Sequence, residues 1–146
     1  MKSHVEFRSS EFPPYDCEEE QINPGRFGKR VAEFLAKGLA EAGFSIGDLV
    51  AEDWGWIVPI ENPGFRLWVG CGNYDEYPDG FLCFIEPHTP VIRKLFRKID
   101  VSERVGALRD AIDRLLTSHP GIQSVKWWTH DEFNNPGAGE QDVGGD

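Results

Sequence analysis

The segment from residue 53 to residue 86 constrains the fold most, because it contains three apolar stretches separated by turn chemistry. Residues 53–61, 65–72 and 80–86 are rich in the aromatic and β-branched side chains that strands favour. Asn62-Pro63-Gly64 separates the first two stretches, and Pro78-Asp79-Gly80 precedes the third. Both tripeptides favour tight turns. The segment therefore predicts an antiparallel meander of three strands.

Helical periodicity flanks the meander on both sides. After a first strand over residues 4–8, Asn23-Pro24 has the N-cap and first-turn chemistry of a helix, which Gly43 would end. A second long helix is expected over 100–118, with Asp100 and Glu103 at capping-box spacing. A short amphipathic helix is expected over 91–99, and a last strand over 122–128.

This order predicts an α+β fold, β-α-β-β-β-(α)-α-β. We expect a two-layer sandwich: a mainly antiparallel sheet of about five strands, with two long helices on one face. Residues 1–133 would form a single domain, and the Gly-rich residues 134–146 a disordered tail. Residues 9–22 read as a loop, and the acidic run from Asp16 to Glu20 within it reads as solvated.

Charge narrows the classes of partner. The 146 residues carry 15 Lys and Arg against 25 Asp and Glu, a net charge of −10. Such a chain would on average repel nucleic-acid phosphates, so no nucleic-acid partner is expected. The negative charge fits a basic protein partner, and it also fits the alternative that the acidic residues only keep the protein soluble. With no apolar h-region and no apolar run of about 20 residues, we expect a cytoplasmic protein that does not engage a membrane.

The motifs favour no cofactor, metal or catalytic chemistry. Three cysteines, Cys17, Cys71 and Cys83, form no C-x-x-C pair, so buried or free thiols are expected rather than disulfides. Gly70-Cys71-Gly72 lacks the third glycine and the following helix of a dinucleotide site. Glu86, His88 and His130 are metal-ligating types without metal-site spacing. We therefore lean against an enzyme.

The meander is unusual because both of its faces carry large apolar side chains. In its first strand, Trp54, Trp56, Val58 and Ile60 are expected on one face. In the second strand, Arg66 and Trp68 are expected opposite Leu67 and Val69, and in the third strand Leu82 and Phe84 are expected opposite Phe81 and Cys83. Two helices cover only one face. The other must be covered by the chain's own loops, by a second copy of the chain, or by a ligand or partner.

Two strings supply the candidate binding residues. The Trp-Gly-Trp string at 54–56 suggests a flat stacking platform or ordinary core packing. The loop after Gly72 is polar and aromatic, which is typical of binding loops and of plain turns. With the Trp-Arg pairing of hot spots, the candidates are Trp54, Trp56, Arg66, Trp68, Asn73, Tyr74, Asp75, Glu76 and Tyr77.

The stretch "EDWGWIVPIENPGFRLWVGCGNYDEYPDGFLCFIE" over residues 52–86 resembles uncharacterised short bacterial proteins. In size, acidity and α+β order the chain also resembles the small acidic immunity proteins that accompany bacterial toxins. The second resemblance implies a non-catalytic inhibitor or immunity-like factor that engages a basic protein partner.

Two other hypotheses remain open on the residues alone. A small enzyme or small-ligand-binding domain would use a polar pocket at the strand ends, with Asp75, Glu76, Glu86 and His88 converging. A homodimer would use the Trp68 face as its self-association surface.

Overall fold

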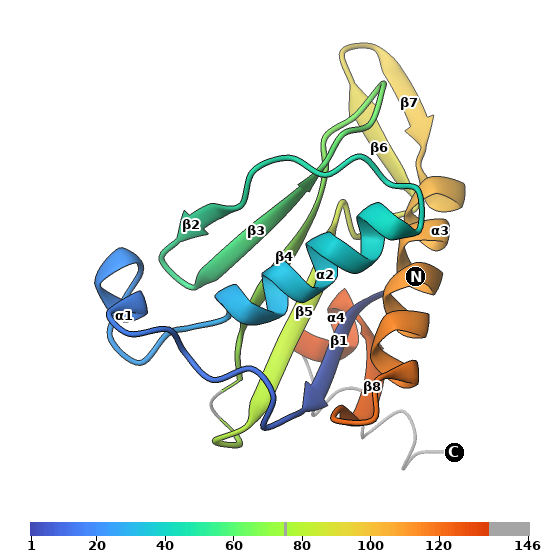
Figure 1. Ribbon diagram of the computed structural model, residues 1–146. Helices are drawn as coiled ribbons and strands as arrows, with labels where there is room; N and C mark the ends of the chain where they lie inside the picture. The colour runs from blue at the N-terminus through green and yellow to red at the C-terminus, as the bar shows by residue number, and fades with distance from the viewer. Residues whose placement is uncertain (75, 135–146) are drawn as a thin grey trace.

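The computed structural model describes residues 1–74 and 76–134 and has an α+β fold, as the sequence predicts (Figure 1). A six-stranded antiparallel sheet, rather than one of about five strands, has the order β2-β3-β4-β5-β1-β8. The strands are β1 (Lys2–Arg8), β2 (Val50–Glu52), β3 (Gly55–Ile60), β4 (Leu67–Asn73), β5 (Gly80–Glu86) and β8 (Gln123–Thr129).

The core lies between one face of this sheet and two helices, α2 (Lys29–Glu41) and α3 (Ser102–Ser118). The apolar stripes of both helices are buried, with Leu35 and Leu108 at their centres. Phe7, Val58 and Val69 meet them from the strands. Here the 3.6-residue and 2-residue periodicities of the sequence correspond directly to the observed contacts. No helix in the described part of the chain is long and apolar enough to cross a bilayer.

Residues 91–99 do not form the predicted helix. They form most of a hairpin of β6 (Val91–Lys94) and β7 (Arg97–Asp100), joined by Leu95 and Phe96. Ile92 pairs directly with Ile99, and both pack against the core. The apolar residues in this short run fit either periodicity, and the contact of the Ile92–Ile99 pair with the core favours the hairpin.

The helix predicted from Asn23-Pro24 begins later, at Lys29. Asn23 opens a turn, in which the Arg26 N–H donates to its carbonyl, and Gly25 has a φ of 77°. Gly28 is the N-cap residue and offers no side-chain cap. The cap comes instead from Glu18 of the short helix α1 (Glu18–Gln21), at the centre of the run that the sequence suggested was solvated.

The C-terminal helix α4 (His130–Asn134) lies on the sheet face opposite α2 and α3 (Figure 1). Its His130 and Phe133 rings contact His4 of β1, which points away from the core. Asn134, the first residue of the predicted tail, ends this helix. The rest of that tail lies outside the described residues.

Candidate functional site

The sheet face opposite the core, hereafter the second face, carries the aromatic side chains of the meander. Cross-strand register places Trp68 opposite Glu86 and Gly70 opposite Phe84. Trp68 and Phe84 are partly exposed, and their ring centroids are 5.6 Å apart. The alternation predicted for β4 and β5 is therefore observed.

Trp54 and Trp56 lie on opposite faces, which corrects the expectation that they share one. Glu52 pairs with Gly55, so Asp53 and Trp54 form the two-residue turn between β2 and β3. A side chain in a turn is free of the strand's alternation, and the Trp54 indole folds back over the second face. Its ring centroid lies 5.1 Å from that of Phe84 and 6.2 Å from that of Trp68.

Gly70 makes room for this aromatic cluster. A Cβ atom at Gly70 would lie 2.5 Å from the Phe84 ring and 2.8 Å from the Trp54 ring. These distances are shorter than van der Waals contact allows, so a side chain at this position would displace the rings. Glycine in a strand interior often marks such a close approach.

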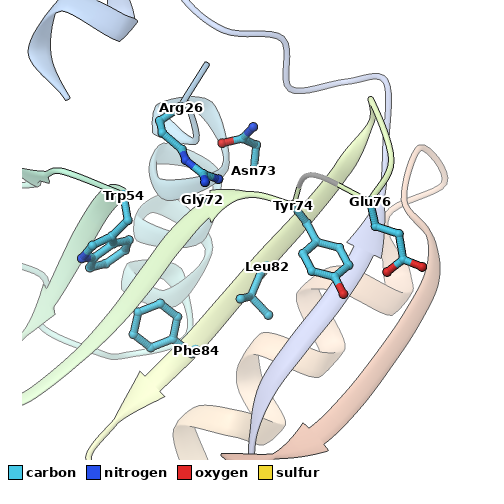
Figure 2. Close-up of a pocket in the computed structure, with 8 residues that line it drawn as sticks. All are labelled: Arg26, Trp54, Gly72, Asn73, Tyr74, Glu76, Leu82 and Phe84. Carbon is cyan, nitrogen blue, oxygen red and sulfur yellow. The ribbon is translucent and has the colours of Figure 1, made fainter. Parts of the chain in front are cut away.

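A surface hollow of about 350 Å³ opens beside the cluster. Figure 2 shows Trp54 and Phe84 at one end, Tyr74 at the other, and Leu82 between them. Gly72 adds no side chain to this part of β4. The lining residues are Arg26, Trp54, Gly72, Asn73, Tyr74, Glu76, Leu82 and Phe84.

Asn73 positions one rim of the hollow. Its side-chain Nδ2 donates to the Gly25 carbonyl at 2.9 Å, and its Oδ1 accepts from the Phe27 N–H at 3.1 Å. Its backbone N–H donates to the Phe27 carbonyl at 2.8 Å. These three bonds tie the 25–27 loop to the end of β4. They thereby place Arg26 at the hollow, with its guanidinium beside Gly72 in Figure 2.

Tyr74 and Glu76 form the opposite rim. Burial, together with a hydrogen bond to the Glu76 carboxylate, raises the pKa of Tyr74 to about 12. The protonated phenol donates to the Glu76 carboxylate. The hollow thus has flat apolar rings inside and polar groups of both charge signs at its rim.

A histidine cluster occupies the other end of the second face, under α4. The His88 and His130 rings stack with centroids 3.9 Å apart, and His88 Nδ1 lies 2.8 Å from a Glu86 oxygen. Burial lowers the pKa of His4 to about 4, with further lowering by His130 and His88. Within residues 1–74 and 76–134, no group of three or more ligating side chains has the geometry to hold a metal ion.

The structure places the candidate residues at several separate positions. Trp54, Asn73, Tyr74 and Glu76 converge on the hollow, and Trp68 adjoins it through Trp54. Arg66 lies over the Trp68 ring at 5.7 Å. The guanidinium carbon of Arg8 lies 4.3 Å from the centroid of the Tyr77 ring, and Tyr77 lines a separate depression.

The remaining candidates lie elsewhere. Trp56 is only 5% exposed and points into the core, and Asp75 lies outside the described residues. Glu76 precedes β5, whereas Glu86 and His88 lie at its far end, so these three do not share a pocket. Cys71 is buried on the core side, and burial beside Cys83 raises the pKa of its thiol, which disfavours a nucleophilic thiolate.

Sequence reasoning missed Arg26, Leu82 and Phe84 as lining residues. The sequence signal was the alternation of β5, which put Leu82 and Phe84 on one face of that strand, and the observed register places this face with Trp68. Nothing local to Arg26 indicated the hollow, because its position depends on the distant Asn73. Comparison with protein-family models, curated proteins and solved structures found no significant match.

Proposed function

We propose that the protein is a non-catalytic binding protein whose second face docks a protein partner, with an aromatic or aliphatic side chain of the partner entering the hollow. The observation that carries the proposal is the hollow of about 350 Å³ between Trp54 and Tyr74. Binding hot spots are typically large side chains seated in pockets of this kind.

The chemistry of the lining favours a flat apolar group with a polar edge. Trp54 and Phe84 supply ring faces for offset stacking, and Leu82 supplies an aliphatic floor. Arg26 and Glu76 at the rim offer a donor and an acceptor to groups beside the entering side chain. The mixed rim would orient the partner, while the rings would supply most of the affinity.

Net charge supports a basic partner. The chain carries −10, so long-range attraction would accelerate encounter with a basic surface before the short-range contacts form. The domain would then work as a two-layer sandwich, with α2 and α3 supporting one face while the part of the second face beyond α4 stays available. This arrangement suits an inhibitor or immunity-like factor.

A small molecule is the second candidate occupant, because the hollow is large enough to hold one. About 350 Å³ lies within the range of small-ligand sites, which are mostly apolar with a few polar groups. A second copy of the chain is the third candidate, because the same apolar surface would be self-complementary across a two-fold axis.

Fragment titration by NMR tests the site itself. Indole and phenylalanine amide, added to the full chain, should shift the Trp54 indole, Leu82 and Tyr74 resonances together. Leu82→Trp should fill the hollow and abolish these shifts, whereas Val50→Trp, on the exposed edge strand, should leave them unchanged. Equal shifts in the wild type and Leu82→Trp would overturn the proposal.

The class of occupant needs a second measurement. A sedimentation profile that changes from dimer to monomer in Leu82→Trp, but not in Val50→Trp, would identify the partner as a second copy. If the protein is a monomer that binds fragments saturably at millimolar concentration, the occupant is a different protein or a small molecule. Basic peptides of increasing length that contain an aromatic residue would then separate these two. Affinity that rises with peptide length would favour a protein partner, and affinity that does not rise would favour a small molecule.

A further inference from the structure

The β6–β7 hairpin projects beyond the sheet at one end of the molecule, beside the β3–β4 connection (Figure 1). Its base is anchored, because Ile92 and Ile99 pack against the core. Lys94 Nζ also donates to the Gly64 carbonyl at 3.2 Å. The hairpin is therefore a short arm with a defined direction.

Two large apolar residues form the tip of this arm. Leu95 is 92% exposed and Phe96 is fully exposed. Leu95 has a φ of 59°, in the left-handed region that glycine and asparagine occupy at least cost. Two-residue hairpin turns favour Asn-Gly or Asp-Gly. With Leu95-Phe96 in their place, the turn carries backbone strain and exposes two apolar side chains. Folding alone gives no reason for that choice.

Four cations surround the tip. Arg93 pairs directly with Lys98, and Lys94 with Arg97, so like charges face each other across both pairs. Directly opposed like charges destabilise a hairpin. Because neighbouring pairs point to opposite faces of a strand ribbon, the cations flank both sides of the arm.

The arm also opposes the charge of the rest of the chain. Its four cations and Asp100 give residues 91–100 a net charge of +3, so the rest of the chain carries −13. Charges are screened over about 8 Å at physiological ionic strength, so the environment of a projecting tip is governed by its own cations.

We propose that this arm binds an anionic lipid surface tip-first, with Leu95 and Phe96 entering the boundary between headgroups and acyl chains. Arg93, Lys94, Arg97 and Lys98 would then lie among the headgroup phosphates on both sides of the arm. An anionic bilayer has a negatively charged headgroup layer with an apolar layer directly beneath it. The arm matches this order, because its cations lie behind an apolar tip. The proposal is independent of the hollow on the second face.

A lipid surface fits better than the phosphates of nucleic acid. Leu95 and Phe96 are both exposed at the end of the arm, and nucleic acid presents an apolar interior only after its bases are unstacked. Two apolar residues and four cations support weak, reversible attachment that salt disrupts, since stable anchoring requires more buried apolar surface.

Vesicle co-sedimentation of the full chain tests the proposal. We expect binding to phosphatidylcholine vesicles that contain about 30% phosphatidylglycerol at low salt, with at least a tenfold loss at about 0.5 M salt. Pure phosphatidylcholine vesicles should bind at least tenfold less. The double substitution Leu95→Ser with Phe96→Ser should weaken binding about tenfold or more, as should Arg93→Gln with Lys98→Gln.

Val50→Ser is the matched control, because it removes an exposed apolar residue from β2, the edge strand of the other sheet, which lies apart from the arm in Figure 1. It should bind like the wild type. Circular dichroism melting should show that the tip variant remains folded, since its two side chains contribute little to the core.

Three outcomes would overturn the proposal. One is the absence of binding to the anionic vesicles, and another is equal binding by the wild type and the tip variant. The third is tighter binding to a duplex DNA of about 20 base pairs than to anionic vesicles, lost in the tip variant, which would assign the arm to nucleic acid.

Discussion

The indole Nε1 of Trp56 donates a hydrogen bond of 3.0 Å to the carboxylate of Glu18, a residue only 2% exposed. The same oxygen accepts from the backbone N–H groups of Gly28 and Lys29 at 2.8 and 3.0 Å. The second oxygen accepts from the Tyr15 N–H at 3.0 Å. One carboxylate therefore links residues 9–22 to the start of α2 and to β3. Its negative charge lies at the positive end of the α2 dipole, where it is stabilising.

Glu18→Gln tests this junction. The variant keeps the shape of the side chain but replaces charge-assisted bonds with neutral ones and turns one acceptor into a donor beside N–H groups. We expect the free energy of unfolding to fall by about 2–3 kcal/mol, measured by urea denaturation. Glu20→Gln, at an exposed position of α1, is the control and should change it by less than about 0.5 kcal/mol. Equal effects of the two substitutions would refute a structural role for the buried charge.

Gly70→Ala tests the close approach on the second face. The added Cβ would overlap the Phe84 and Trp54 rings, so we expect a loss of about 1–3 kcal/mol and a changed tryptophan emission spectrum. Gly106→Ala is the comparison, because a Cβ at that position in α3 meets no atom within 4 Å. It should stabilise the protein by about 0.5–1 kcal/mol through helix propensity. A neutral Gly70→Ala would mean that the rings do not pack over this glycine.

His4 should make stability depend on pH. Its pKa is about 4 in the folded protein and 6.5 as a free side chain, so the unfolded chain binds more protons between these values. Stability should therefore fall as pH decreases from about 6.5 toward 4. We expect this residue to account for about 1–2 kcal/mol of the loss, less than the full shift implies because solvent screens part of it.

His4→Gln removes this titration. Its free energy of unfolding should decline less than that of the wild type between pH 7 and pH 4.5, in urea titrations at each pH. His119→Gln is the control, since that ring lies on the core side against Phe12 and Phe34. Parallel curves for the wild type and His4→Gln would contradict the assignment.

Asn73→Ala should weaken fragment binding without unfolding the protein. It removes two side-chain hydrogen bonds that hold the 25–27 loop against β4, and with them the placement of Arg26. We expect a loss of about 1–2 kcal/mol in stability and about tenfold weaker binding of a fragment with an acidic edge. Indole, which has no acidic group, should bind with nearly wild-type affinity. An equal loss for both fragments would show that the loop shapes the whole hollow.

Periodic patterns in the sequence determined much of the architecture. The alternation within β4 separated Trp68 from Leu67 and Val69, and the alternation within β5 separated Leu82 and Phe84 from Cys83. The apolar stripes around Leu35 and Leu108 predicted the two core helices. Such patterns are local, because each residue's face depends only on its position along a strand or helix.

Tertiary structure decided the rest. The run at 91–99 fitted both a helix and a hairpin, and the contact of Ile92 and Ile99 with the core selected the hairpin. Trp54 left the face of Trp56 because a turn interrupts the alternation of the strand. Glu18 became a buried cap, and Arg26 a rim residue, only through partners far along the chain. A carboxylate is solvated or buried according to the donors that folding brings to it, and those donors lie outside any local window of sequence.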